Sequence, residues 1–429
     1  MSKLVICGKK QISGTHRTPG NKNAALPMIA ASLLTSEPVT LKNLPLIADV
    51  RTTLKLVAEL GADVHFNESK REVTIHAKKI RRELNKELCG KVRSSILFAG
   101  PLLARFGSAK LYPPGGDVIG RRRIDTHLEG LQALGATITT GNSYVFKAPK
   151  GLTGAYILLD EASVTATENI VMAATLAKGT TTLYNTACEP HVQNLCTMLN
   201  AMGAKISGIG TNRLTIEGVE KLTGTEQRIG PDYIDAGSYM VAALITGGDL
   251  TIEDIEPDDF SVFIKPFTRF GVKYQFDTVK KTLRIPPRQK LKTAYDFGDA
   301  IPKIEDGPWP MLPSDLMSVL IVLATQARGT TLFFEKMFES RMYFVDHLLG
   351  MGARIVQCDP HRIVVTGPTP LHGSRVASPD IRAGMALLIA ALGAKGETSI
   401  LNANSIDRGY EAVEQELRNL NASIERIND

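Results

Sequence analysis

The stretch AELGADVHF at residues 58–66 contains the pattern that decides the fold: an apolar helix end, a Gly-Ala turn and a short alternating strand. The pattern recurs as QALGATITT (132–140), NAMGAKISG (200–208), TRFGVKYQF (268–276), LGMGARIVQ (349–357) and RNLNASIER (418–426). The turn residues Gly61, Gly135, Gly203, Gly271, Gly352 and Asn421 follow one another at intervals of 74, 68, 68, 81 and 69 residues. Glycine or asparagine suits a left-handed helix C-cap, so each copy predicts helix, cap and strand.

A second pattern precedes the copies: an apolar helix, a turn and another strand, as in MAATLAKGTTTLYN, VAALITGGDLTIED, VLIVLATQARGTTLFF and LLIAALGAKGETSIL. Six α/β repeats of about 70 residues divide naturally into two domains of three, with helices inside and sheets outside as one possible arrangement. The crossover is expected near Pro231-Asp232, and strands before Gly20 are expected to pair with the later domain. The repeats alone also allow a ring-shaped scaffold without chemistry.

Composition is typical of a globular protein, since 43% of the 429 residues are hydrophobic and 22% are charged. The sequence begins without the apolar core of a signal peptide and has no stretch long enough to span a bilayer, so a cytoplasmic protein without a membrane partner is expected. The net charge of +6 is modest, no basic helix is interleaved with aromatics, and no nucleic-acid partner is expected. Five unclustered cysteines predict free thiols, most of them buried, and no zinc site.

Two segments of the first half combine glycine with cations. Lys22 and Asn23 lie where a loop opens an apolar helix, and a helix N-terminus favours anions. Lys22 taken alone is more often a solvated charge. The second segment, 111–124, contains Asp117 and three consecutive arginines among prolines and glycines. It predicts a mobile loop that closes on an anion, with an exposed charged turn as the alternative.

The second half offers an acid and several arginines. Asp315, in Pro-Ser-Asp-Leu before an apolar helix, is either a general base or, with Ser314, an ordinary N-cap. Arg341, Arg382 and Arg408 lie beside predicted turns of successive repeats. Because corresponding positions of repeats converge in space, these arginines are candidates to clamp a carboxylate and a phosphate. Any one of these arginines alone is more often a surface or capping residue.

These residues are where the chain resembles the enolpyruvyl transferases, and among them the UDP-N-acetylglucosamine 1-carboxyvinyltransferases of peptidoglycan synthesis. The likeness runs end to end and is most specific at GNKNAALP, GPLLARFG, PPGGDVIGRR, PSDL, FESR, DIRAG and IDRGYE. The shikimate 3-phosphate branch typically has serine after the lysine, whereas Asn23 stands there in this chain. The resemblance implies an inside-out α/β barrel of two domains, 22–230 and 1–21 plus 231–429, with the active site in the cleft between them.

The resemblance also implies substrates and residue roles. Phosphoenolpyruvate would be bound by Lys22, Asn23, Arg122 and Arg408, with Arg341 and Arg382 nearby. UDP-N-acetylglucosamine would be bound by Arg93, Arg122, Arg123, Ile124, Asp125, Thr126, Glu161, Ala162, Ser163, Val164, Asp315 and the backbone of Met337. The sugar hydroxyl would add to C2 of phosphoenolpyruvate and phosphate would then leave, with Asp315 as base, Asp117 as acid and no metal or organic cofactor. The oligomeric state does not follow from the sequence.

The chain departs from the family pattern at two places. Asp117 stands where most members carry cysteine, so we expect the epoxide fosfomycin, which alkylates that cysteine, not to inactivate this protein. In the nucleotide region, Glu161, Cys188 and His191 replace residues that are commonly lysine, arginine and glutamate. These changes leave open a different acceptor, such as shikimate 3-phosphate or another sugar, and a non-catalytic ligand-binding paralog.

Overall fold

The computed structural model describes residues 2–428, which form two compact units. The first unit comprises Gly20–Asp117 and Arg122–Gly230, and the second comprises residues 2–19, 118–121 and 231–428. The chain passes between them at both ends of residues 118–121 and at two further places that adjoin each other, after Pro19 and after Gly230. Asn21 N–H donates to the Gly230 carbonyl at 2.7 Å, and Asp232 N–H donates to the Pro19 carbonyl at 2.9 Å. Gly20 and Asn21 therefore group with the first unit, whereas the sequence-based division assigned them to the other one.

The first unit contains three sheets and the helices that they cover. Its helices are α1 (Lys22–Ala31), α2 (Ala48–Glu59), α3 (Lys86–Cys89), α4 (Ala99–Phe106), α5 (Asp125–Ala133), α6 (Val164–Ala174) and α7 (Pro190–Ala201). One sheet has the order β13-β3-β5-β4 (Thr225–Arg228, Val39–Lys42, Glu72–His76, Asp63–Asn67). The others are β6-β8-β7 (Ser108–Leu111, Tyr144–Lys147, Thr137–Thr139) and β11-β12-β10-β9 (Lys205–Ser207, Arg213–Glu217, Thr180–Tyr184, Tyr156–Leu158).

The second unit repeats this plan. Its helices are α8 (Tyr233–Thr246), α9 (Pro257–Thr268), α10 (Ser314–Gln326), α11 (Val345–Gly350), α12 (Ile381–Gly393) and α13 (Val413–Asn419). The sheets are β15-β16-β14-β2 (Gln275–Asp277, Thr282–Ile285, Asp249–Glu253, Ser13–Arg17), β17-β18-β20-β19 (Lys303–Glu305, Gly329–Phe334, Arg362–Gly367, Arg354–Gln357) and β21-β22-β1-β23 (Arg375–Ala377, Glu397–Leu401, Ser2–Cys7, Ser423–Asn428). β1 pairs with β22 and β23 and β2 pairs with β14, which confirms the expectation for strands before Gly20.

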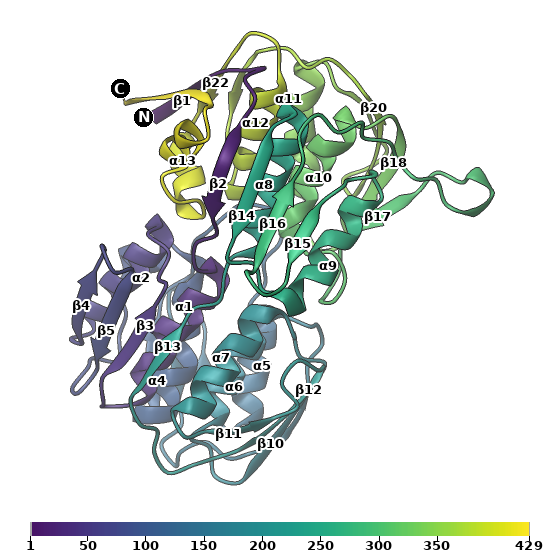
Figure 1. Cartoon of the computed structure of the whole chain (residues 1–429). Coiled ribbons are helices and arrows are strands. Elements are labelled where there is room, and N and C mark those ends of the chain that lie inside the picture. The colour runs from purple at the N-terminus through teal and green to yellow at the C-terminus, as the bar shows by residue number, and fades with distance from the viewer. Residues whose placement is uncertain (1, 429) are drawn as a thin grey trace. The chain divides into compact units, whose positions relative to one another are not determined.

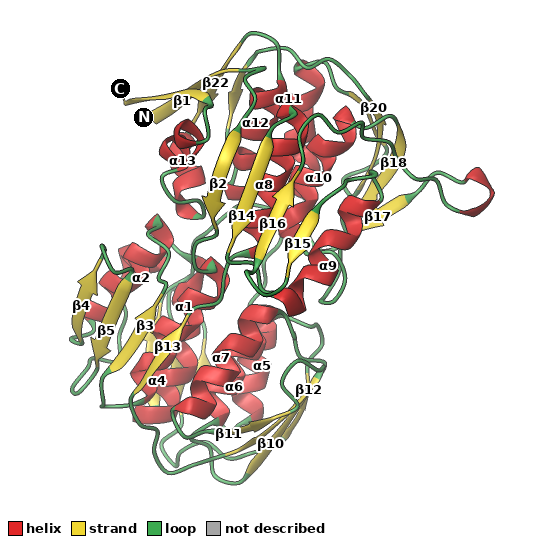
Figure 2. Ribbon diagram, in the orientation of Figure 1, coloured by secondary structure: helices red, strands yellow, loops and turns green. Residues whose placement is uncertain are grey.

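Helices lie inside each unit and sheets lie outside (Figures 1 and 2). In the second unit α8, α10 and α12 pack against one another, and every residue of α12 is buried. A helix that is apolar on all sides has to be buried in this way, while the amphipathic strands cover it. This arrangement confirms the inside-out α/β fold expected from the repeats.

The six repeat turns have the predicted conformation. The backbone angle φ is positive at each of them, from 68° at Gly271 to 100° at Gly61 and Gly203, and it is 70° at Asn421. Each turn joins a helix to a strand: α2 to β4, α5 to β7, α7 to β11, α9 to β15, α11 to β19 and α13 to β23. The left-handed turn ends the helix, so the chain can reverse and enter the outer sheet.

Candidate functional site

Lys22 is the first residue of α1 and is buried, which excludes the solvated alternative. Its Nζ lies 2.8 Å from Oδ2 of Asp49, at the start of α2, and both side chains are buried. Asn21 caps α1 by accepting the Ala24 N–H at 3.0 Å, while Asn23 is half-buried. The N-terminal turn of α1 therefore presents a fixed cation and the positive end of a helix dipole.

Arg93 and Arg122 lie together at the base of the glycine-rich loop. Gly115 N–H donates to the Cys89 carbonyl at 3.0 Å, and Gly116 is in the left-handed region with φ of 112°. A Cβ on Gly116 would lie 3.0 Å from Cβ of Arg93 and 3.5 Å from a guanidinium nitrogen of Arg122. Burial, and then repulsion by Arg122, lowers the pKa of Arg93 to about 10. Two cations held this close favour an anion beside them. Asp117 follows Gly116 and is half-buried.

The start of α5 connects to the Asp160-Glu161 turn. Thr126 Oγ1 donates to Oδ1 of Asp160 at 2.7 Å, and the same oxygen accepts the Glu161 N–H at 3.1 Å. Arg123 is paired with Asp125. Burial and Asp160 raise the pKa of Glu161, whereas Thr126, Arg123 and Arg93 act in the opposite direction. The structure thus places Glu161 within the electrostatic reach of two candidate nucleotide-binding arginines.

The other residues of this region are ordered by α6 and α7. Ser163 is the N-terminal flanking residue of α6 and Val164 its first residue, while Ala162 precedes them. His127 is buried between Thr165 Oγ1 and Asn169 Nδ2, each at 3.1 Å, and burial lowers its pKa to about 3, so it is a neutral packing residue. His191 is buried in α7 and Cys188 is half-buried.

Asp315, in the first turn of α10, joins two arginines of the second unit. Arg341 Nη2 donates to its Oδ1 at 3.1 Å, and Arg382 Nη2 lies 2.9 Å from its Oδ2. Arg382 is in the first turn of α12, and Arg341 begins a short 3₁₀ helix after β18. Residues of two successive repeats therefore converge on one carboxylate, as expected for these two arginines. The N-cap of α10 is Pro313, which shows that the N-cap alternative for Ser314 and Asp315 was wrong.

Each of the two guanidinium groups has buried N–H donors without a hydrogen-bond partner in the protein. Arg341 and Arg382 are 4% and 5% exposed, and Nε and Nη1 of Arg341 and Nη1 of Arg382 are buried without a hydrogen-bond partner. Burial acts to lower the pKa of Arg382, but Asp315 and Tyr410 outweigh it and hold the pKa well above the usual value, so the group is charged. Buried donors without partners are costly, and an anionic ligand would satisfy them.

The remaining candidates lie on turns. Met337 is exposed and donates its N–H to Oε1 of Glu335 at 3.1 Å. Arg408 is half-buried at the end of the 3₁₀ helix Ala403–Arg408. The convergence of Arg408 with Arg341 and Arg382 stays a prediction. Residues 118–121 group with the second unit, where the Arg121 N–H donates to Oε2 of Glu339 at 3.1 Å.

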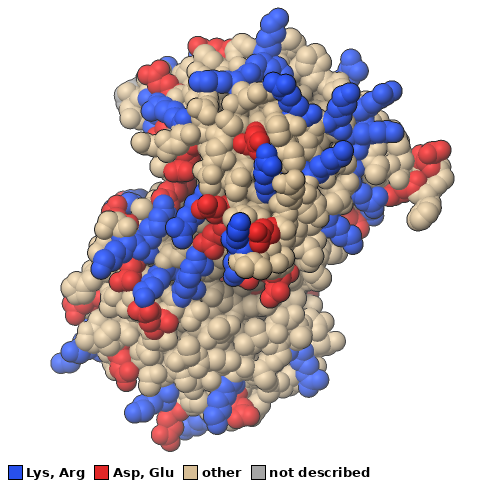
Figure 3. Space-filling view, in the orientation of Figure 1, with Lys and Arg blue, Asp and Glu red and all other residues tan. Residues whose placement is uncertain are grey.

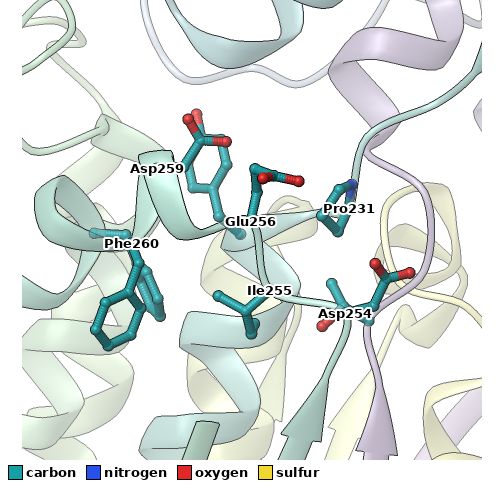
Figure 4. Close-up of a pocket in the computed structure, with 9 residues that line it drawn as sticks. Pro231, Asp254, Ile255, Glu256, Asp259 and Phe260 are labelled. Atoms are coloured by element: carbon teal, nitrogen blue, oxygen red, sulfur yellow. The ribbon is translucent and has the colours of Figure 1, made fainter. Parts of the chain in front are cut away.

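Other features of residues 2–428 do not form a second reaction site. A small pocket is bordered by Asp254, Glu256, Asp259 and Phe260 (Figure 4), but the carboxylates point in different directions. No group of three or more His, Cys, Asp or Glu within the described residues has the geometry of a metal site. Basic and acidic side chains are interspersed on the face drawn in Figure 3. No helix within the described range combines the length and hydropathy of a bilayer-spanning segment.

The cysteines confirm one expectation and correct another. All five are free thiols. Cys89 and Cys196 are buried and Cys188 is half-buried, but Cys7 and Cys358 are exposed, so the expectation that most are buried was wrong. Cys7 ends β1 and Cys358 follows β19, where alternate side chains face away from the helices.

Sequence reasoning missed Asp49, Asp160, Asp306 and Glu335. Asp49 and Asp160 pair with predicted residues, and Glu335 bonds to the turn that carries Met337. Asp306 lies beside Glu335 at the end of the neighbouring strand. Their signal in the sequence is weak, because an acid after a strand or in a first helical turn is common.

The chain is similar over nearly its whole length to known proteins. Residues 6–417 match the family model of EPSP synthase (3-phosphoshikimate 1-carboxyvinyltransferase). The chain is 52% identical to the UDP-N-acetylglucosamine 1-carboxyvinyltransferase of Treponema denticola, covering 99% of each chain, and 50% identical to that of Bradyrhizobium diazoefficiens, covering 99% and 97%. Among solved structures it is similar to the enolpyruvyl transferase NikO from Streptomyces tendae, with 26% identity, a TM-score of 0.87 and coverage of 99% and 98%. EPSP synthase from Acinetobacter baumannii, at 20% identity and a TM-score of 0.78, shares the fold.

Proposed function

The chain belongs to the enolpyruvyl transferase family, and from this premise we propose that it transfers the enolpyruvyl group of phosphoenolpyruvate to the 3-hydroxyl of UDP-N-acetylglucosamine with release of phosphate. This is the first committed step of peptidoglycan synthesis. The full-length identity to relatives that carry this activity in their names supports the choice of acceptor. The observation that carries the proposal is the pair Arg341 and Arg382, which share Asp315 and retain buried donors for an anion.

We assign phosphoenolpyruvate to Lys22, Asn23, Arg122, Arg341, Arg382 and Arg408. A planar guanidinium matches a carboxylate or a phosphate with two parallel hydrogen bonds, while a lysine acts as a compact charge. The buried position of Lys22 supports this role, because its charge is screened little by water. The substrate would accept hydrogen bonds from the buried N–H groups of Arg341 and Arg382 that have no partner in the protein.

We assign the nucleotide sugar to Arg93, the segment Arg122–Thr126, the turn Glu161–Val164, Asp315 and the Met337 backbone. The closeness of Arg93 to Arg122 supports an anionic group such as a diphosphate at this place. Arg123 and Arg93 lie within electrostatic reach of Glu161 and offset the negative charge that this side chain would present to that group. An acid at position 161 is thus compatible with a nucleotide diphosphate.

The proposed chemistry is addition followed by elimination. The sugar oxygen forms a bond to C2 of phosphoenolpyruvate while its proton passes to Asp315, and Asp117 protonates C3. The tetrahedral intermediate then returns a C3 proton to the Asp117 carboxylate and expels phosphate, which restores the double bond. Arg341 and Arg382 hold Asp315 in place through both carboxylate oxygens, and clustered cations stabilise the charge that develops on the substrate.

The deciding experiment measures phosphate release from phosphoenolpyruvate with purified protein, with and without UDP-N-acetylglucosamine. Phosphate that appears only with this sugar is the expected result, and the Asp117→Asn variant is expected to lose it. If shikimate 3-phosphate or another sugar supports release instead, the acceptor is wrong while the family chemistry holds. If none of these acceptors supports phosphate release, a non-catalytic binding protein is favoured.

A further inference from the structure

Two buried carboxyl groups lie behind Asp315 and Arg341. Asp306 directly follows β17 and Glu335 directly follows β18. The two strands are parallel and place Glu305 opposite Phe334, so the next residues of each strand, Asp306 and Glu335, are neighbours. Asp306 N–H donates to the Phe334 carbonyl at 3.4 Å, and both carboxyl side chains are 0% exposed. The strand register therefore forces two acids together away from water.

One carboxylate oxygen of this pair has no hydrogen-bond donor from the rest of the protein. Glu335 accepts from Ser314 Oγ at 2.9 Å and from the N–H groups of Met337 and Phe338 at 3.1 Å each. Oδ1 of Asp306 accepts the Lys336 N–H at 2.6 Å, but its Oδ2 is buried without a protein donor. Two adjoining carboxylates cannot both be charged in such a place. A proton on Glu335 that is donated to Oδ2 of Asp306 completes the set.

Charged groups on the neighbouring elements fit a neutral Glu335. Nε of Arg341 lies 3.8 Å from Oε2 of Glu335, and Nδ1 of His361 lies 2.7 Å from the backbone carbonyl oxygen of Glu335. Lys336 Nζ is directed to Glu305 at 3.3 Å. Burial and Asp306 raise the pKa of Glu335 to about 9 even though Arg341 opposes this shift. Near neutral pH Arg341 therefore meets a neutral neighbour on one side and the carboxylate of Asp315 on the other.

We propose that Asp306 and Glu335 share one proton and together act as positioning residues. Because the shared proton keeps Glu335 neutral, the charge of Arg341 interacts with Asp315 and with the anionic substrate. An ionised Glu335 would compete for Arg341. The pair also orders its surroundings, because Glu335 holds Ser314, which precedes Asp315, and the backbone of the turn that leads to Arg341. The assignment of Arg341 and Asp315 to substrate rests on the proposed function, but the shared proton does not.

Variants that change charge but keep shape test the proposal. In Glu335→Gln the amide can donate to Asp306 and its oxygen can accept the same N–H groups, so kcat/KM at pH 7 should stay within about threefold of the wild type. In Asp306→Asn, burial still raises the pKa of Glu335, but the contribution of the second acid is lost and the new amide can donate to the Glu335 carboxylate, so the ionised form is favoured at a lower pH. The KM for phosphoenolpyruvate should then rise about tenfold at pH 8 and remain near the wild-type value at pH 6.

The double variant Asp306→Asn/Glu335→Gln separates positioning from folding. Glutamine cannot ionise, so the double variant should recover the KM that Asp306→Asn loses at pH 8. Loss of activity in Glu335→Gln at every pH, an unchanged pH profile in Asp306→Asn, or no recovery in the double variant would each overturn the proposal.

The infrared difference spectrum between the wild type and Glu335→Gln tests the proton directly and needs no turnover. The carbonyl stretch of a protonated carboxyl group should be present at pH 7 in the wild type only, and it should be lost as the pH rises through about 9. The bands of other buried carboxyl groups, such as that of Glu168, cancel in the difference. Absence of this titration would overturn the shared proton. Because the band does not depend on the acceptor, it distinguishes a failure of this inference from a failure of the proposed function.

Discussion

Lys22 Nζ is bound to Oδ2 of Asp49 at 2.8 Å, and neither side chain is more than 10% exposed. Removing one partner of a buried ion pair leaves an uncompensated charge, which costs more than the loss of an exposed pair. We expect Asp49→Asn to lower the free energy of unfolding of the first unit by about 3 kcal/mol. Urea denaturation measures this change. The control Glu68→Gln, which breaks the exposed pair with Arg51, should cost below about 1 kcal/mol, and equal losses would contradict the prediction.

His16 predicts a pH dependence of stability. Its Nε2 lies 2.6 Å from Oδ1 of Asp235 and its Nδ1 lies 3.6 Å from Glu416. Burial lowers the pKa, but the two carboxylates outweigh it and raise the pKa from 6.5 to about 9. The protonated form is favoured in the folded state, so its contribution is complete below pH 6.5 and is lost as pH rises through 9.

The unfolding free energy of the wild type relative to His16→Gln should therefore fall by at most about 3 kcal/mol between these pH values. The exposed residue His65 supplies the control, and His65→Gln should keep the wild-type pH dependence. A constant difference between wild type and His16→Gln from pH 6 to pH 9 would show that the pKa of His16 is not raised in the folded protein.

Asp117 predicts the response to fosfomycin. A carboxylate is a weaker nucleophile than a thiolate, so incubation with the epoxide should leave the activity of the wild type unchanged over time. The variant Asp117→Cys should lose activity progressively and gain the mass of the inhibitor in the intact-protein mass spectrum. Covalent labelling of the wild type at Asp117 would contradict this expectation.

Arg382 should not tolerate lysine. Its guanidinium contacts Asp315 with one nitrogen and keeps a second for an anion, and an ammonium cannot reproduce this fork. We expect Arg382→Lys to lower kcat/KM for phosphoenolpyruvate about a hundredfold. The matched control is Arg362→Lys at the exposed pair with Asp359, which should leave kcat/KM unchanged. Similar values for the two variants would remove Arg382 from the proposed site.

Gly135 tests the repeat turns. Its φ is 97°, and an added Cβ would meet nothing within 4 Å, so only backbone strain opposes a side chain. Gly135→Ala should lower the free energy of unfolding by about 1 to 2 kcal/mol. Gly141 also has open space but no positive φ, and Gly141→Ala should be nearly neutral. Urea denaturation measures both variants, and the difference between their free energies of unfolding gives the cost of placing a side chain at positive φ.

The sequence by itself determined the repeated architecture, because its signals are local. A glycine or asparagine after an apolar helix and before an alternating strand specifies a left-handed turn wherever it occurs, and φ is positive at all six such positions, Asn421 included. Local motifs also located Lys22, Asp315, Arg341 and Arg382, since each lies at or near the start of a helix.

The tertiary structure alone decided which partners these residues meet. Asp49 reaches Lys22 from another helix, and Arg341 and Arg382 reach Asp315 from separate repeats. Asp306 and Glu335 become neighbours only through the register of β17 and β18. Strand register and helix packing depend on contacts between distant parts of the chain, which no local pattern encodes. The protonation of Glu335 follows from that packing, because burial beside a second acid, and not the residue type, sets it.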